Sequence, residues 1–266
     1  MNLVRCKACE KKYILQVRTR LQGDDLPATF NFAELVTCKR SKPAPPTADA
    51  FCIAIDEVTQ QRYLCKDQSK QHWLPLVEWM TQQLARECGV LVPDCFAVEL
   101  EANPGQYLFG SKWEGGAEDY SPGLVNKVTN PSEFSRIFAF DLLVHNVDRH
   151  MNNYLYLQLA GDTVLKAMDH SRTWWFSGWP LPAPPPHVTS ATMTNFSHWS
   201  AQVPWDGLAA ERVVNAWSQI SAQDAADMVD SAPLSWIDPV LRNELVSWWG
   251  SPDWSYRTAQ IIGVLP

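Results

Sequence analysis

The chain has 266 residues, of which 46% are hydrophobic and 19% charged, and its formal net charge at pH 7 is −7. This length suffices for one large core or for two lobes with a cleft between them. The acidic balance argues against a nucleic-acid surface, and no apolar run reaches the length of a membrane span. We therefore expect neither nucleic acid nor membrane as a partner.

The first residues and the cysteines bear on the compartment. Arg5, Lys7, Lys11 and Lys12 interrupt the start of the chain, so we expect no signal peptide. Seven cysteines, an odd number, are typical of a reducing compartment, and we expect a cytoplasmic protein. The C-x-x-C pair at residues 6–9 lacks two further ligands of matching spacing, so free thiols are favoured over a zinc site.

The first expected strands follow a basic stretch. Residues 51–55 and 62–66 are strand-like runs on either side of a polar turn, and Lys66 ends the second. Lys39–Thr47, ahead of them, is basic and proline-rich. We expect a solvated loop there, with contact to phosphate groups as the alternative. No glycine lies between Gly23 and Gly89, so this region has no glycine-rich phosphate loop.

A helix is predicted from Trp73 to Cys88, because apolar residues recur there at helical spacing and Gly89 provides a stop. Glu78 and Glu87 flank the apolar stripe on opposite sides, so either carboxylate is a candidate partner for Lys66. Taken alone, a solvated lysine and solvated glutamates are the ordinary interpretation. Residues 91–100 and 107–110 then supply two further strand regions, before a crossing into the C-terminal half.

An apolar helix is predicted over residues 131–145, with Asn130 as N-cap and Pro131 at the first helical position. A hairpin is predicted further on, from strands at 154–157 and 163–168 that a turn at 160–162 connects. The segment between the helix and the hairpin holds the most informative motif of the chain.

That motif is Asn146-Val147-Asp148-Arg149-His150-Met151-Asn152-Asn153, of the form N-x-D-R-H-x-x-N, and Asp169 follows the second hairpin strand. Phosphoryl transfer from ATP needs a carboxylate that takes the proton of the attacking hydroxyl, and oxygen ligands that hold magnesium against the phosphates. Asp148 is the candidate base, and Asn153 and Asp169 are the candidate magnesium ligands. We expect Arg149 and His150 to pack and brace the loop.

These motifs resemble those of the HipA-like kinase family, above all its small stand-alone members. The family's catalytic loop has the form N-x-D-R-H-x-x-N. A second match is Met168-Asp169-His170-Ser171-Arg172. It is similar to the family's metal-binding segment, in which a histidine follows the aspartate. Phe109-Gly110-Ser111-Lys112-Trp113 is similar to its segment at the junction of the lobes. The resemblance covers roughly residues 48–176.

The resemblance implies roles for residues outside the loop. Lys66 would bind the ATP phosphates, and Glu78 rather than Glu87 would orient it, since the family's glutamate lies eleven residues before the helix-ending glycine. Backbone groups of Phe109, Gly110 and Ser111 would meet the edge of the adenine.

The implied fold class is α+β, a two-lobed protein-kinase-like fold. Residues 1–110 would form an N-terminal lobe with a small antiparallel sheet and one helix. Residues 111–266 would form a mainly helical C-terminal lobe, with helices at 208–220, 222–231 and 239–249. The implied activity is ATP- and Mg²⁺-dependent phosphorylation of serine or threonine in a protein. In some members of the family this makes the kinase the toxin of a toxin–antitoxin pair.

Two other functions stay open. A nucleotide-binding pseudokinase that acts through a protein partner would explain the missing glycine loop, and a kinase of a small molecule or lipid headgroup shares the same loop chemistry. The proline-rich run Trp179–Pro186 is either a docking loop or a rigid connector. For the 13 tryptophans, core packing is favoured over a partner-binding patch. The partner and the oligomeric state are not predicted.

Overall fold

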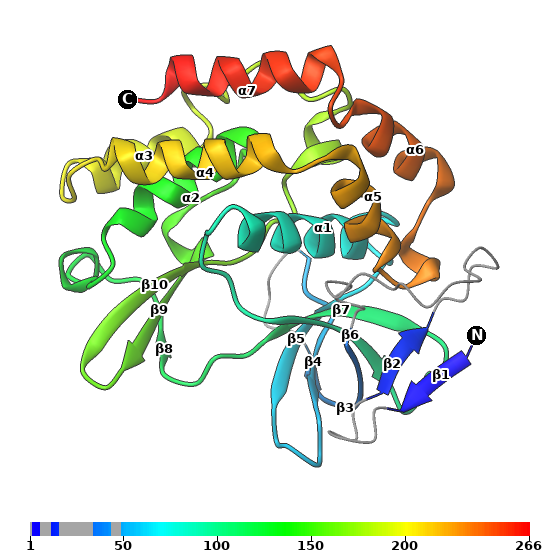
Figure 1. Ribbon diagram of the computed structural model, residues 1–266. Coiled ribbons are helices and arrows are strands. Elements are labelled where there is room, and N and C mark those ends of the chain that lie inside the picture. Colours follow the sequence, from blue (N-terminus) through cyan, green and yellow to red (C-terminus); the bar gives the residue numbers. More distant parts are fainter. Residues whose placement is uncertain (1, 6–11, 16–33, 44–48) are drawn as a thin grey trace. The chain divides into compact units, whose positions relative to one another are not determined.

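The computed structural model describes residues 2–5, 12–15, 34–43 and 49–266 (Figure 1). The C-x-x-C pair lies outside these residues. Contacts divide the chain into two units. The first contains the described residues up to Trp79, Asp94–Trp113 and Gln223–Glu244; the second contains Met80–Pro93, Glu114–Ala222 and Leu245–Pro266. The lobe boundary predicted after residue 110 stays a prediction. The two units alternate along the chain, with one boundary after Trp113 and others inside three helices.

The first unit is built on a sheet in the order β1-β2-β3-β4-β5-β7-β6. Its strands are β1 Asn2–Arg5, β2 Lys12–Leu15, β3 Glu34–Pro43, β4 Cys52–Ile55, β5 Arg62–Lys66, β6 Cys95–Leu100 and β7 Tyr107–Lys112. A further pairing between β3 and β6 closes β3, β4, β5, β7 and β6 into a barrel. This pairing is parallel and runs from Leu35 opposite Ala97 to Cys38 opposite Leu100.

Two expectations are corrected by β3. The sheet is not a small antiparallel one, because β3 closes it through a parallel pairing with a strand far away in the sequence. The residues Lys39–Pro43, expected in a loop, belong to β3 and pair with β4. The side chains of residues 39–42 are exposed, so this half of the strand carries no apolar alternation that would reveal it.

The barrel interior is filled by small and medium-sized apolar side chains, among them Cys52, Ala54, Cys65 and Val98. Gly110 in β7 lies against this core, and a Cβ atom added there would stand 2.4 Å from Val98 Cγ2. Close approach of β6 and β7 therefore requires glycine at position 110.

The helix expected from residue 73 to 88 is confirmed as α1, Leu74–Glu87. It ends at Gly89, whose φ of 72° is favourable for glycine. The amide of Gly89 donates to the carbonyl of Arg86 at 2.9 Å, and that of Val90 to the carbonyl of Ala85 at 2.8 Å. These two bonds form a Schellman motif, which satisfies the last carbonyls of the helix.

The remaining elements begin with a small sheet of three antiparallel strands in the order β10-β9-β8. These are β8 Ala117–Glu118, β9 Tyr154–Leu159 and β10 Asp162–Ala167. The helices are α2 Ser132–Leu143, α3 Ala191–Ser200, α4 Gly207–Gln219, α5 Ala222–Asp230, α6 Pro239–Trp248 and α7 Pro252–Val264. Short 3-10 turns are Val125–Lys127, Met151–Asn153, Trp174–Ser177 and Leu234–Trp236. Within the second unit, α2 packs against α3, α4, α7 and β10 (Figure 1).

The predicted hairpin and the three predicted C-terminal helices are confirmed within one to two residues at most ends. The helices α3 and α7 were not predicted. The cap predicted for α2 is wrong, because Pro131 occupies the N-cap position without a side-chain hydrogen bond. The Asn130 side chain instead pairs with the backbone of Leu165 in β10, donating to its carbonyl at 3.0 Å and accepting from its amide at 2.8 Å.

Several tryptophans form part of the second unit's core. Trp174, Trp217, Trp248 and Trp249 are buried, with ring centroids 4.6 to 6.3 Å apart. The proline-rich run that follows Trp179 contains no helix or strand. In the described part of the chain, none of the helices combines the length and the apolar character needed to cross a membrane.

Candidate active site

The first unit contains a buried ion pair between Lys66, at the end of β5, and Glu78, in α1. The Lys66 Nζ donates to Glu78 Oε1, and the two residues are only 5% and 1% exposed. Glu87, the rival partner, is exposed near the end of α1. A carboxylate that accepts a hydrogen bond from a buried lysine holds its side chain in a fixed direction. The pair has the form that the resemblance implies, while its role toward ATP stays a prediction.

Phe109, Gly110 and Ser111 lie inside β7. Each has a partner on both neighbouring strands; Gly110, for example, faces Cys65 in β5 and Phe96 in β6. Residues paired on both sides use their backbone amide and carbonyl groups for hydrogen bonds within the sheet. The need for glycine at position 110 is explained by its close contact with Val98. Their contact with an adenine edge stays a prediction.

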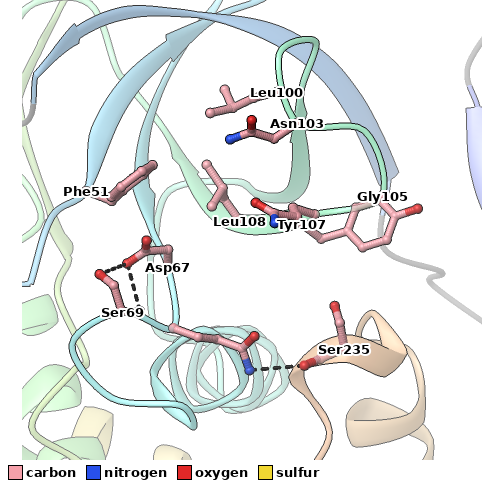
Figure 2. A pocket seen from close by; sticks show the side chains of 11 residues that line it. Phe51, Asp67, Ser69, Leu100, Asn103, Gly105, Tyr107, Leu108 and Ser235 are labelled. Atoms are coloured by element: carbon pink, nitrogen blue, oxygen red, sulfur yellow. Dashed lines mark hydrogen bonds between the residues drawn. The ribbon is translucent and has the colours of Figure 1, made fainter.

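A pocket of about 280 Å³ lies at the end of the barrel where β5 and β6 finish and β7 starts (Figure 2). Its walls come from the residue before β4, the end of β6, the start of β7, the loop between these two strands, the β5–α1 connection and the 3-10 turn at residue 235. It is lined by Phe51, Asp67, Gln68, Ser69, Leu100, Asn103, Gly105, Gln106, Tyr107, Leu108 and Ser235. Since neither Lys66 nor Glu78 lines it, this pocket is distinct from the predicted phosphate site.

In the second unit, the hairpin brings the two candidate magnesium ligands to the same end of the sheet. Asn153 directly precedes β9 and Asp169 follows β10 by two residues, while Tyr154 pairs with Ala167. One step further, the Met168 amide donates to the Asn153 carbonyl at 3.1 Å. Antiparallel pairing therefore places residues 153 and 169 near each other although they are sixteen positions apart.

Arg149 joins the catalytic loop to this end of the hairpin. Its Nη1 donates to the carbonyl of Asn153 at 2.8 Å and to the carbonyl of Met168. Its Nη2 lies 3.2 Å from Nδ1 of His170, which accepts, because a guanidinium has only donors. The side chain of Arg149, the residue after Asp148, thus contacts Asn153 and both sequence neighbours of Asp169. The expectation that Arg149 braces the loop is confirmed.

The charge of Arg149 is balanced by Asp141 in α2. Arg149 Nε donates to Asp141 Oδ2 at 2.9 Å and Nη2 to Oδ1 at 3.0 Å, in a bidentate pair that is almost fully buried. Burial by itself disfavours the charged guanidinium, but Asp141 outweighs it and keeps the pKa of Arg149 above its ordinary value. Asp141 Oδ1 also accepts from Asn146 at 2.9 Å, whose own Oδ1 accepts from the amide of Asp148 at 3.1 Å.

The Asp148 carboxylate itself is only half-buried, and none of the described residues forms a hydrogen bond with it. Next to it, Thr192 in α3 fixes the loop backbone. Thr192 Oγ1 accepts from the Arg149 amide at 3.0 Å and donates to the Asn146 carbonyl at 2.7 Å. His150, by contrast, is exposed, so the expectation that it packs against the loop is wrong.

Sequence reasoning missed Asp141 and Thr192 as parts of this site. A signal existed for Asp141, since it interrupts an otherwise apolar stretch of a buried helix, where a charge needs a partner. No signal existed for Thr192, which reaches the loop from a helix more than forty residues later.

The chemistry of Asn153 and Asp169 fits a magnesium ion. The Asn153 Nδ2 donates to the Asp148 carbonyl at 2.9 Å, which leaves the amide oxygen as the atom that can face a cation. Asp169 adds a carboxylate, which Ser171 orients by donating to its Oδ1 at 2.8 Å. The described residues contain no cluster of three or more His, Cys, Asp or Glu suited to a metal. Magnesium needs none, because it usually takes one or two carboxylates, waters and substrate phosphates.

Comparison with solved structures identifies the fold. The chain is similar to a crystal structure of the Helicobacter pylori proinflammatory kinase CtkA, with a TM-score of 0.53 and 13% identity over 86% of this chain and 94% of that one. The chain therefore has a kinase-like fold.

Two other structures are more distant. Shewanella oneidensis HipA, solved with HipB and operator DNA, has a TM-score of 0.46 at 12% identity, covering 76% of this chain and 57% of that one. WaaP, solved with an acyl carrier protein, has a TM-score of 0.34 at 13% identity, covering 84% and 89%. Neither carries further weight. Searches of protein-family models and of curated proteins found no match.

The buried pair of Asp141 and Arg149 gives a test of stability. The substitution Asp141→Asn keeps the shape but leaves the guanidinium without its counter-charge, and breaking such a pair typically costs about 3–5 kcal/mol. We expect a correspondingly lower urea midpoint, measured by tryptophan fluorescence. The matched control Asp162→Asn, at an exposed position of the hairpin, should change stability by no more than about 0.5 kcal/mol. Equal midpoints for both variants would contradict the role given to Asp141.

Proposed function

We propose that the chain is an ATP- and Mg²⁺-dependent kinase that transfers the γ-phosphate to a hydroxyl, with serine or threonine of a protein as the acceptor. The observation that carries this proposal is the network around Arg149. It holds the loop of Asp148, the backbone of Asn153 and the end of the strand before Asp169 in one arrangement. The kinase-like fold supports it.

In this proposal Asp148 is the base. Its half-exposed carboxylate can meet an acceptor hydroxyl, while its amide is fixed by Asn146. Asn153 and Asp169 would hold Mg²⁺, which would neutralise charge on the phosphates when bound. Arg149 is not itself a reacting group, because all its donors are directed at Asp141 and at neighbouring backbone and ring acceptors.

Lys66 binds the phosphates and Glu78 orients it, and Phe109, Gly110 and Ser111 belong to the segment that meets the adenine. These residues fall in the proposed N-terminal lobe, residues 1–110, or at its end; the base and the metal ligands fall in the proposed C-terminal lobe, residues 111–266.

The basic residues of β3 are poor substitutes for a glycine-rich loop. Lys39 Nζ donates to Glu57 Oε2 at 2.6 Å, and the Arg40 guanidinium lies 5.0 Å from the centre of the Phe51 ring. We therefore assign the phosphates to Lys66 and to the proposed Mg²⁺, and not to Lys39 or Arg40.

The lack of a glycine-rich loop favours a second candidate, a nucleotide-binding pseudokinase that acts through a protein partner. A kinase of a small molecule or lipid headgroup would use the same base and metal ligands, and a screen of acceptors separates it from a protein kinase. Action as a toxin rests only on the resemblance of the motifs to HipA-like kinases, and a growth assay tests it.

The role of Asp148 is tested by Asp148→Ala. Loss of a positioned base typically lowers the rate about 10²–10⁴-fold, whereas ATP binding does not involve the carboxylate. We expect phosphoryl transfer to fall by that factor and the dissociation constant for ATP to stay within about twofold, in a radiolabel assay combined with calorimetry. Asp162→Ala in the hairpin turn serves as the control with normal rate. Near-normal turnover in Asp148→Ala would mean that another group is the base.

The metal ligands are tested by thermal unfolding. A ligand that binds only the folded state stabilises it by about 2.7 kcal/mol at one hundred times its dissociation constant. We expect the melting temperature to rise with ATP plus Mg²⁺ and to rise less with either alone. Asp169→Asn should erase the magnesium-dependent part, and Asp162→Asn should retain it. If the melting temperature of the wild type does not change with saturating ATP and Mg²⁺, both the kinase and the pseudokinase are contradicted. If Asp169→Asn shows the same shift as the wild type, Asp169 is not a magnesium ligand.

A further inference from the structure

One stretch of the C-terminal half belongs to the first unit. We call Gln223–Glu244 the clamp segment; it contains most of α5, the 3-10 turn Leu234–Trp236 and the start of α6. The sequence analysis had assigned its helices to the C-terminal lobe. Its contacts explain why a stretch so far along the chain groups with the barrel.

The first contact is with α1. Trp79 Nε1 donates to Ser231 Oγ at 3.0 Å, and the rings of Trp79 and Trp236 meet edge to face with centroids 6.3 Å apart. Trp236 is 1% exposed, and its Nε1 donates to the carbonyl of Tyr107 at the start of β7, at 2.8 Å. The two indoles thus join α1, the clamp segment and the barrel.

The second contact is with the connection between β5 and α1. Gln68 Nε2 donates to the carbonyl of Ser235 at 3.0 Å and to the carbonyl of His72 at 2.8 Å. One amide therefore fixes both ends of a short connection and ties it to the clamp segment.

These contacts lie beside both members of the buried ion pair. Trp79 directly follows Glu78, and Gln68 lies two residues after Lys66. Both Lys66 and Glu78 are thus held through neighbours that touch the same distant segment. A buried pair needs good geometry to offset the loss of hydration of two charges, so a small displacement of α1 relative to β5 weakens it.

We propose that the clamp segment is the positioning element of the Lys66–Glu78 pair, with Trp236 as its main positioning residue. It sets the place of α1 against the barrel and so the direction in which Glu78 holds Lys66. The structural part of this inference stands on the contacts above; its consequence for catalysis rests on the proposed function.

The test compares three single variants. Trp236→Phe removes the hydrogen bond to the Tyr107 carbonyl and part of the packing on Trp79. Gln68→Ala removes the bond to Ser235 at an exposed side chain, so it serves even where Trp236→Phe folds poorly. The control is Trp217→Phe, the same change at a fully buried tryptophan of the second unit whose Nε1 has no hydrogen-bond partner.

The first readout is independent of activity. Limited acetylation with acetic anhydride, quantified by mass spectrometry, reports the reactivity of Lys66 relative to the exposed Lys70. Loss of one hydrogen bond of ordinary strength changes an equilibrium by about 2- to 10-fold. We expect Lys66 acetylation to rise by about that factor in Trp236→Phe, to rise less in Gln68→Ala and to stay unchanged in Trp217→Phe.

The second readout is kcat/KM for ATP. It should fall in Trp236→Phe, and the fall should disappear when Glu78→Gln is already present, because both changes act through one carboxylate. An unchanged Lys66 reactivity in both Trp236→Phe and Gln68→Ala, or equal increases in the Trp217→Phe control, overturns the clamp. Full additivity of Trp236→Phe with Glu78→Gln overturns it as well. Absence of any phosphoryl transfer in the wild type overturns the proposed function instead. The acetylation result alone then tests whether the clamp segment positions the Lys66–Glu78 pair.

Discussion

The candidate active site depends on the burial of one charge. Arg149 is almost completely excluded from water, and a buried guanidinium is tolerated only when a counter-charge and a full set of acceptors surround it. Asp141 supplies the charge, and the carbonyls of Asn153 and Met168 supply acceptors. Because these acceptors belong to the loop end and the strand end that carry the candidate functional residues, satisfying Arg149 also fixes the geometry of the site. Arg149, which has no reactive role, thus fixes the backbone that carries Asp148, Asn153 and Asp169.

Both halves of the site are held from far along the chain. Thr192, in α3, pins the backbone on either side of Asp148, and the clamp segment contacts the neighbours of Lys66 and Glu78. Loop residues that must keep a fixed direction gain it from such supporting contacts, since loops alone are mobile. In this chain the supports come from α3 and from α5 to α6, so sequence changes well outside the motif are expected to alter the site.

Features with local causes could be predicted from the sequence. The end of α1 follows from Gly89, the hairpin from its turn residues, and the bracing function of Arg149 from the motif around it. Features with distant causes could not. The strand β3 is polar along half its length and pairs with a strand 62 residues away, and Asn130 pairs with Leu165 instead of capping its own helix. The roles of Lys66, Glu78, Asp148, Asn153 and Asp169 are predictions that rest on their residue types and spacing.

The most direct test of the account is transfer of label from [γ-³²P]ATP to protein, measured with the wild-type chain alone and in cell lysate, with Mg²⁺ and with excess chelator. The account predicts label on serine or threonine with Mg²⁺ and none with chelator. Absence of label on any protein at saturating ATP and Mg²⁺, from a folded chain that binds the nucleotide, would contradict a protein kinase and favour the pseudokinase or a small-molecule acceptor.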